Sequence, residues 1–266
     1  MIRDITLGQY YPGESWIHRL DARVKLVATL LFIVGLFLVD DYPGFICPVL
    51  GTILVISMAR VPVSYMLRGL TPVFFIIVLT FIINMFMITG KVLVYLGPLT
   101  ITYEGLQTAV FMALRLILLI VGSSVLTLTT KPVSLTEGME RLLAPLKKIG
   151  VPAHELAMMM TIALRFIPTL LDETDKIMKA QMARGADFES GNIFARAKSL
   201  IPLLVPLFIS AFRIAQDLAM AMESRCYHGD VGRTHMHVMK LAARDYISIA
   251  AFIIFFAAII FEKIYF

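Results

Sequence analysis

Charged residues are scarce in this sequence, and their scarcity excludes an ordinary soluble globular domain. They make up 16% of the 266 residues, while hydrophobic residues make up 59%. A soluble domain carries about 25% charged residues. The apolar residues are also concentrated in blocks, and a helix needs about 20 of them to cross a bilayer. The composition therefore predicts an integral membrane protein.

The motifs of a nucleotide-binding or catalytic protein are missing as well. The Gly90–Lys91 pair lacks the earlier glycine and the following Ser or Thr of a phosphate-binding loop. His154 and Glu155 begin like a zinc-protease motif, but Met158 stands where its second histidine is required. The sequence therefore predicts no enzyme activity, no catalytic residue and no cofactor.

Cysteine is rare, and the two cysteines form no closely spaced motif. Cys47 and Cys226 lie far apart, which argues against a disulfide framework or a zinc ribbon. A loose group of side chains near the second cysteine could in principle bind a metal ion, but its spacing matches no standard site: Cys226, His228, Asp230, His235 and His237. We predict no metal site. No run of Lys and Arg with interleaved aromatics suggests a nucleic-acid partner either.

Five apolar blocks predict transmembrane helices, and hence an all-α, polytopic membrane protein. They are Val24–Val39, Gly44–Met58, Leu70–Ile88, Leu106–Leu128 and Tyr246–Phe261. The first two are short, and local thinning of the bilayer would accommodate them. Residues 90–105, with Gly97–Pro98 as a turn, are predicted to be a loop. Arg115 interrupts the fourth block, where it is expected either to bond to carbonyls or Asn84 or to contact a partner subunit.

Residues 131–244 are charged and amphipathic, and they predict a separate domain of long helices. A short helix is expected over Glu137–Lys147, and a Met-rich helix over Ala153–Phe166. Two longer amphipathic helices should follow, one from Pro168 to Ala183 and one from Pro202 to about Ser224. Residues 200–211 are apolar enough for a sixth span or a re-entrant piece, although we expect a helix that dips into the interface. The predicted organisation is thus residues 1–130 with four spans, residues 131–244, and residues 245–266 with the last span.

The loop charges predict the orientation. The segment before the first span, the loop around Arg60 and Arg68, and residues 131–244 hold most of the Lys and Arg. The opposite loops hold only Lys91 and Lys263. Because basic loops stay on the cytoplasmic side, the N-terminus and residues 131–244 are predicted to be cytoplasmic.

Each long amphipathic helix ends in a small-Arg-small triplet: Ala183-Arg184-Gly185 and Ser224-Arg225-Cys226. A cation at one helix end is accounted for by the helix macrodipole. Two matching triplets favour a further interpretation, in which a slim tip enters a groove and the arginine offers a rigid fork to carboxylates or carbonyls.

With these triplets the sequence resembles the T component of energy-coupling factor transporters, a family that carries an Ala-Arg-Gly-type motif at the end of each of two coupling helices. The second triplet departs from that pattern by Ser224 and Cys226. Two more stretches are similar to the family's sequences: residues 8–15 with 18–26, where the family usually has Pro at Ala22, and residues 164–168 followed by Glu173.

The resemblance implies a non-catalytic subunit of the prokaryotic cell membrane that bridges two cytoplasmic ABC-type ATPases to one membrane-embedded substrate-binding subunit. The complex would import a vitamin or a metal ion, and the other membrane subunit would recognise it. The two triplets would bind the ATPases. We further expect an apolar surface for the substrate-binding subunit on the stripes of the two helices: Leu170, Met178, Leu207, Ile214 and Leu218.

Two other classes of function remain open at this point. A stand-alone secondary carrier needs polar groups that converge at the membrane midplane, and only Asn84 and Arg115 are candidates. A membrane-embedded enzyme or assembly scaffold is the third alternative. The enzyme needs a nucleophile or a metal constellation, for which the sequence supplies no motif.

Overall fold

The computed structural model describes residues 10–39, 41–96, 99–188, 192, 194, 198–229 and 239–265. Its elements, in chain order, are α1 (Ala22–Leu38), a 3-10 helix η1 (Pro43–Phe45), α2 (Ile46–Ala59), α3 (Val63–Met87), β1 (Val92–Leu96), β2 (Leu99–Thr102), α4 (Tyr103–Thr129), α5 (Pro132–Leu143), a 3-10 helix η2 (Ala144–Ile149), α6 (Ala153–Ala183), α8 (Ile201–Glu223) and α9 (Ala243–Tyr265). The predicted all-α class is confirmed. Contacts divide the chain into a first unit, Gly8–Met139 with Met239–Phe266, and a second unit whose described part lies within Glu140–Val238.

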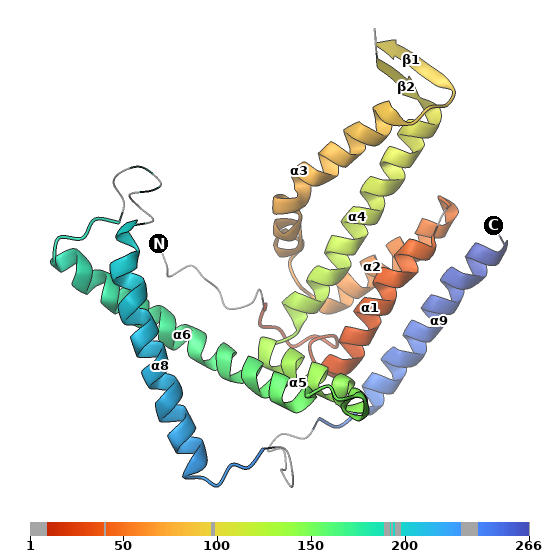
Figure 1. Ribbon diagram of the computed structural model, residues 1–266. Coiled ribbons are helices and arrows are strands. Elements are labelled where there is room, and N and C mark those ends of the chain that lie inside the picture. The colour runs from red at the N-terminus through yellow and green to blue at the C-terminus, as the bar shows by residue number, and fades with distance from the viewer. Residues whose placement is uncertain are drawn as a thin grey trace. The chain divides into compact units, whose positions relative to one another are not determined.

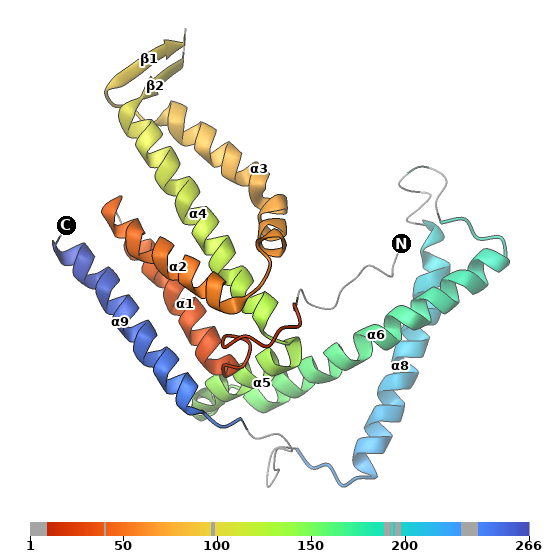
Figure 2. The ribbon, with the colours of Figure 1, turned by 180° about the vertical axis from the view of Figure 1, so that it is seen from behind.

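The first unit is a bundle in which α3 packs along α4, and α1 packs against both α4 and α9 (Figure 1). Its core has two clusters. One joins α1, α4 and α9 through Leu36, Leu118 and Ile259. The other includes Met66 of α3 and Leu128 of α4. The view from behind also shows α3 beside α4, and α1 between α4 and α9 (Figure 2).

In the second unit, α6 and α8 pack against each other. Three side-chain hydrogen bonds pair α6 with residues that run through α8 and just past its end. Gln181 Nε2 donates to the Pro202 carbonyl at 3.4 Å. The Ser210 hydroxyl donates to Glu173 at 3.4 Å, and the Tyr227 hydroxyl donates to Met158 Sδ at 3.0 Å. Residues progressively later in the chain from the start of α8 contact residues progressively earlier in α6. The two helices are therefore antiparallel.

Five helices of the described chain are long and apolar enough to cross a membrane: α3, α4, α6, α8 and α9. Only 6% of the most apolar stretch of α3 and 17% of that of α4 is buried within the chain, so these side chains need another apolar environment. The chain is therefore a polytopic membrane protein. The set differs from the five predicted blocks. The first two blocks form helices of only 17 and 14 residues, α1 and α2, whereas α6 and α8 belong to the segment predicted to be cytoplasmic.

The predicted loop over residues 90–105 is wrong, because it contains an antiparallel hairpin. Strands β1 and β2 pair with Val94 opposite Ile101, and an irregularity lies between Val92 and Val94. Gly97 and Pro98, the predicted turn, lie outside the described residues. The Thr102 hydroxyl accepts a hydrogen bond from the Gly105 N–H at 3.0 Å and thereby caps α4. The hairpin thus leads directly into the first turn of that helix.

Two predicted helix boundaries are also wrong. The break at Pro168 does not occur: α6 is one helix of 31 residues with this proline inside it. Proline removes one backbone hydrogen bond, but long helical segments on both sides can continue past it. The short helix begins earlier than expected and changes type. The α-helix covers Pro132–Leu143 and a 3-10 helix follows, because Pro145 has no N–H for the next α-helical bond.

Candidate functional site: two matched helix ends

The end of α6 is a tight turn built around Gly185. The Ala186 N–H donates to the Gln181 carbonyl at 3.0 Å, and the Gly185 N–H donates to the Met182 carbonyl at 3.0 Å. Gly185 has φ +88°. A 6→1 bond enclosing a 5→2 bond, with a left-handed residue between them, is the Schellman motif. It satisfies carbonyls that a helix end leaves without partners.

The end of α8 repeats this motif residue for residue. The Tyr227 N–H donates to the Met222 carbonyl at 3.1 Å, and the Cys226 N–H donates to the Glu223 carbonyl at 2.9 Å. Cys226 has φ +54°. By hydrogen-bond position, the second triplet therefore superimposes on the first, and its last residue takes the place of a glycine.

The shared turn explains the composition of the triplets better than the small size of the residues beside each arginine does. The third position needs a left-handed backbone, which glycine adopts freely and an L side chain adopts at a cost. The central arginine, Arg184 or Arg225, lies immediately before that turn. All six triplet residues are exposed, so each arginine projects from a rigid, hydrogen-bonded helix end.

The antiparallel pairing separates the two arginines. Arg184 follows Gln181, which contacts the start of α8, whereas Arg225 precedes Tyr227, which contacts Met158 near the start of α6. Gln181 lies 23 residues after Met158, which corresponds to on the order of 35 Å of helix at 1.5 Å per residue. The two tips therefore lie at opposite ends of the helix pair.

The five residues expected to form the apolar surface, Leu170, Met178, Leu207, Ile214 and Leu218, are all half-buried. These residues lie on the sides of α6 and α8 that face each other. Ser210, whose hydroxyl donates to Glu173 of α6, is one helical turn from Ile214. Another side of α8 is far more exposed. Phe208 is 63% and Phe212 is 67% exposed, and with Ile201 and Val205 they form a stripe at helical spacing. The residue pattern alone did not predict this stripe.

The N-terminal stretch, residues 10–25, joins the ends of three helices in the first unit. The Lys25 ammonium donates to the Thr129 carbonyl at 2.9 Å, at the end of α4. Asp21 accepts from the Arg23 N–H and so caps α1. The Asp21 N–H donates at 2.9 Å to Asp245 of α9. The likeness of this stretch to the family signature therefore has a structural explanation: it holds α1, α4 and α9 together.

His18 fixes the turn that precedes α1. Its Nε2 donates to the Tyr11 carbonyl at 3.0 Å, and its Nδ1 accepts from the Ser15 hydroxyl at 2.7 Å. Burial lowers the pKa of His18 below its ordinary value of 6.5, and the nearby Lys25 charge lowers it further, although the bond to Tyr11 opposes them. The neutral ring with its proton on Nε2 matches both hydrogen bonds.

The two candidate midplane groups both bond to backbone carbonyls. Arg115 donates to the Val39 carbonyl at the end of α1, and its guanidinium lies 4.9 Å from the ring centre of Phe111. Asn84 donates to the Thr80 carbonyl at 2.8 Å. Arg115 therefore bonds to a carbonyl, as the first of its two alternatives predicts, and its contact with a partner subunit stays a prediction.

The loose metal-binding group falls partly outside the described chain. Asp230, His235 and His237 are among the residues that the structure does not describe. Within the described ranges, no three His, Cys, Asp or Glu side chains are placed to hold a metal ion.

Comparison with known proteins identifies the family. The family model CbiQ, described as cobalt transport protein, matches residues 13–237. A relative from Thermosediminibacter oceani, named energy-coupling factor transporter transmembrane protein EcfT, is 61% identical over 252 residues, covering 95% of this chain and 94% of its own length. This chain belongs to the EcfT family.

Other EcfT proteins agree along almost the whole chain. The one from Clostridium kluyveri is 57% identical over 250 residues, covering 93% of each chain. The one from Bacillus subtilis is 45% identical over 264 residues, covering 99% of this chain and all of the relative. The predicted family is thus confirmed, and with it a multi-pass transmembrane component of a prokaryotic membrane transporter.

Proposed function

We propose that this chain is the coupling subunit of an energy-coupling factor importer, linking two ABC-type ATPases to one membrane-embedded substrate-binding subunit. The single observation that carries the proposal is the matched pair of exposed arginine-bearing ends on one antiparallel helix pair. Two equivalent tips about 35 Å apart suit two equivalent partners, one at each end. The chain itself hydrolyses no ATP in this proposal.

Each triplet supplies a binding element of suitable chemistry. The Schellman turn fixes the backbone, so that Ala183 and Gly185, or Ser224 and Cys226, add little bulk beside the arginine. Arg184 and Arg225 then present planar forks for carboxylate or carbonyl groups of an ATPase groove. An anchoring arginine at an interface is commonly worth about 2 kcal/mol or more.

The substrate-binding subunit is proposed to rest on the apolar stripes of α6 and α8. Leu170, Met178, Leu207, Ile214 and Leu218 are half-buried, and the exposed Phe208 and Phe212 extend the apolar surface of α8. An apolar patch of this kind commonly marks an interaction site. Methionines on such a surface can adapt as the partner binds and releases.

The proposed orientation has the N-terminus and the second unit in the cytoplasm, where ATP is available. The proposed cargo is a vitamin or another micronutrient, such as a metal ion, recognised by the substrate-binding subunit. The secondary-carrier hypothesis is less favoured, since its two candidate polar groups, Arg115 and Asn84, each bond to a backbone carbonyl.

The proposal is tested by co-purification of this chain with co-expressed ATPases and substrate-binding subunit. Arg184→Glu with Arg225→Glu should lose the ATPases, lose uptake, and still insert in the membrane. Phe208→Asp with Phe212→Asp, on the exposed side of α8, should keep the ATPases, lose the substrate-binding subunit, and uncouple ATP hydrolysis from uptake. Unchanged recovery of every subunit with both double variants would refute the coupling role.

A further inference from the structure

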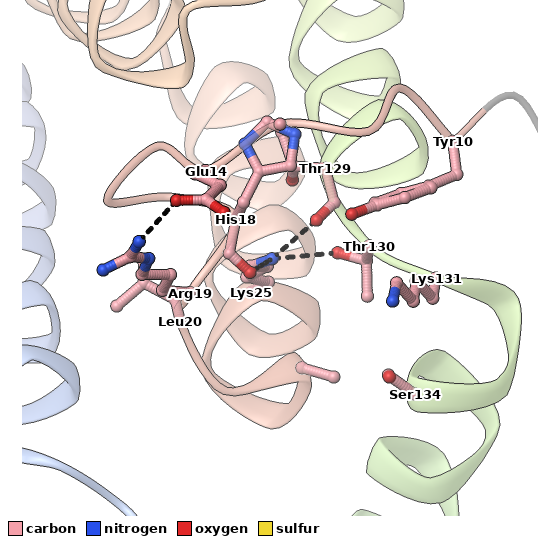
Figure 3. A pocket seen from close by; sticks show the side chains of 12 residues that line it. Tyr10, Glu14, His18, Arg19, Leu20, Lys25, Thr129, Thr130, Lys131 and Ser134 are labelled. Carbon is pink, nitrogen blue, oxygen red and sulfur yellow. Dashed lines mark hydrogen bonds and ion pairs between the residues drawn. The ribbon is translucent and has the colours of Figure 1, made fainter.

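A cavity of about 330 Å³ lies in the first unit, between the segment before α1, the first turns of α1 and the junction of α4 with α5. Its lining includes Arg19 on one side and Tyr10, Thr130, Lys131 and Ser134 on the other, with Lys25 between them (Figure 3). The coupling role proposed above uses none of these side chains. Its volume is in the range of small-ligand pockets.

The charges around this cavity favour an anion. Arg19, Lys25 and Lys131 contribute three positive charges, and Glu14, which pairs with Arg19 at 2.9 Å, contributes one negative charge. Asp21 and Asp245 offset part of the Lys25 charge, but neither lines the cavity. Lys25 is only 7% exposed and its ammonium already donates to three oxygens. It therefore supplies charge rather than a free donor.

Free donors are found on the opposite wall. The Lys131 ammonium lies 5.8 Å from the ring centre of Tyr10. Within the part of the chain that the structure describes, neither this ammonium nor the Ser134 hydroxyl has a hydrogen-bond partner. Helix α5 begins at Pro132, which has no N–H, and the Leu135 N–H donates to the Lys131 carbonyl at 3.0 Å. The N–H groups of Val133 and Ser134, in the first turn, have no acceptor inside the helix. The positive end of the helix dipole adds to the attraction for an anion.

The position of the cavity identifies the kind of anion. The cavity lies at Thr129, the last residue of α4, which is an apolar helix of 27 residues and a candidate span. The end of a span is at the level of the lipid headgroups. Basic pockets at this level between transmembrane helices bind anionic headgroups.

We propose that this cavity binds a phosphoryl anion supplied by an anionic phospholipid, with Lys131, the Ser134 hydroxyl and the first turn of α5 as its donors. The headgroup would connect the α4–α5 junction to the segment that precedes α1. This lipid site depends on the membrane location of the chain but not on the coupling role. Either proposal can therefore be wrong while the other is right.

The test uses the purified full-length chain in detergent micelles and follows its melting temperature during lipid titration. Dioleoylphosphatidylglycerol should raise the melting temperature more than dioleoylphosphatidylcholine does. In Lys131→Gln, the phosphatidylglycerol concentration for half of that shift should rise about fivefold, the effect of one cation near a membrane surface. Each variant is compared with its own melting temperature in phosphatidylcholine, which removes differences in intrinsic stability.

Three further variants and one further ligand make the test specific. Lys131→Arg should retain the effect, Ser134→Ala should weaken it, and Lys91→Gln should leave it unchanged, although it removes the same charge. Millimolar inorganic phosphate in phosphatidylcholine should produce no comparable shift. An equal loss in Lys91→Gln, an equal response to both lipids, or a full response to free phosphate would each overturn the proposal.

Discussion

Gly185 and Cys226 occupy the same position in two helix-ending turns, each donating its N–H to the carbonyl three residues before it, with φ +88° and +54°. Helices α6 and α8 thus end in one shared backbone motif. The arginine before it faces solvent in both cases. The departure of the second triplet from the Ala-Arg-Gly pattern changes the side chain at this position but leaves the turn intact.

The first prediction concerns that cysteine. Cys226→Gly should raise the free energy of unfolding by about 1 kcal/mol, because glycine adopts the left-handed backbone without the steric cost of a Cβ. Gly185→Cys should lower it by a similar amount, since an added Cβ meets no atom within 4 Å and only the backbone cost remains. Chemical denaturation in micelles measures both. Ser224→Gly, in the helical backbone two residues earlier, should be mildly destabilising, and an equal gain there would contradict the explanation.

The second prediction concerns the side of the membrane. Lys91→Cys, in a chain with Cys47→Ala and Cys226→Ala, should react in intact cells with an impermeant thiol reagent. The native Cys226, which is exposed, should be protected in intact cells carrying Cys47→Ala and react in inverted vesicles. The opposite pattern at both positions would reverse the orientation inferred from the loop charges.

The third prediction concerns pH. The pKa of His18 lies below 6.5 in the folded chain, so as pH falls the unfolded state takes up the proton first. Stability from this ring is therefore complete above about pH 6.5 and is lost as pH falls through the folded pKa. His18→Gln, whose amide can still donate to the Tyr11 carbonyl, should flatten the stability profile between pH 7 and 5. A wild-type slope in this variant would show that other groups control the loss.

The fourth prediction concerns Lys25. Lys25→Met removes the donor to the carbonyls of His18 and Thr129 and to the Thr130 hydroxyl. Leaving such buried acceptors unpaired should cost about 1–3 kcal/mol of folding free energy. Lys91→Met, at an exposed position, should change it by less than about 0.5 kcal/mol. Equal melting temperatures for Lys25→Met and the parent would mean that the junction of α1 and α4 does not depend on this ammonium.

The helices of the first unit were predictable from sequence because their apolar blocks are long or bounded by clear turns. The hairpin was missed although a signal existed: β-branched and aromatic residues flank Gly97–Pro98, as in a hairpin. A loop was predicted instead, because the segment is short and connects two predicted spans. The continuity of α6 through Pro168 could not be read from sequence, because proline ends some helices and only bends others.

The candidate site was recognised from sequence by residue type but not by geometry. Arg184 and Arg225 stand out as cations at the ends of amphipathic helices. The left-handed turn at Cys226 does not, since a cysteine carries no preference for that conformation. The antiparallel order of α6 and α8 depends on contacts between distant residues, such as Glu173 with Ser210. The exposed stripe at Phe208 and Phe212 became distinct only when the buried side of α8 was known.

The central claim is that each arginine-bearing helix end binds one ATPase. Native mass spectrometry of the assembled complex counts the ATPases on each variant directly. The parent should retain two, Arg184→Glu or Arg225→Glu one, and the double variant none. Lys179→Glu, an exposed charge reversal close to the end of α6, should retain two. Two ATPases on the double variant would contradict the account.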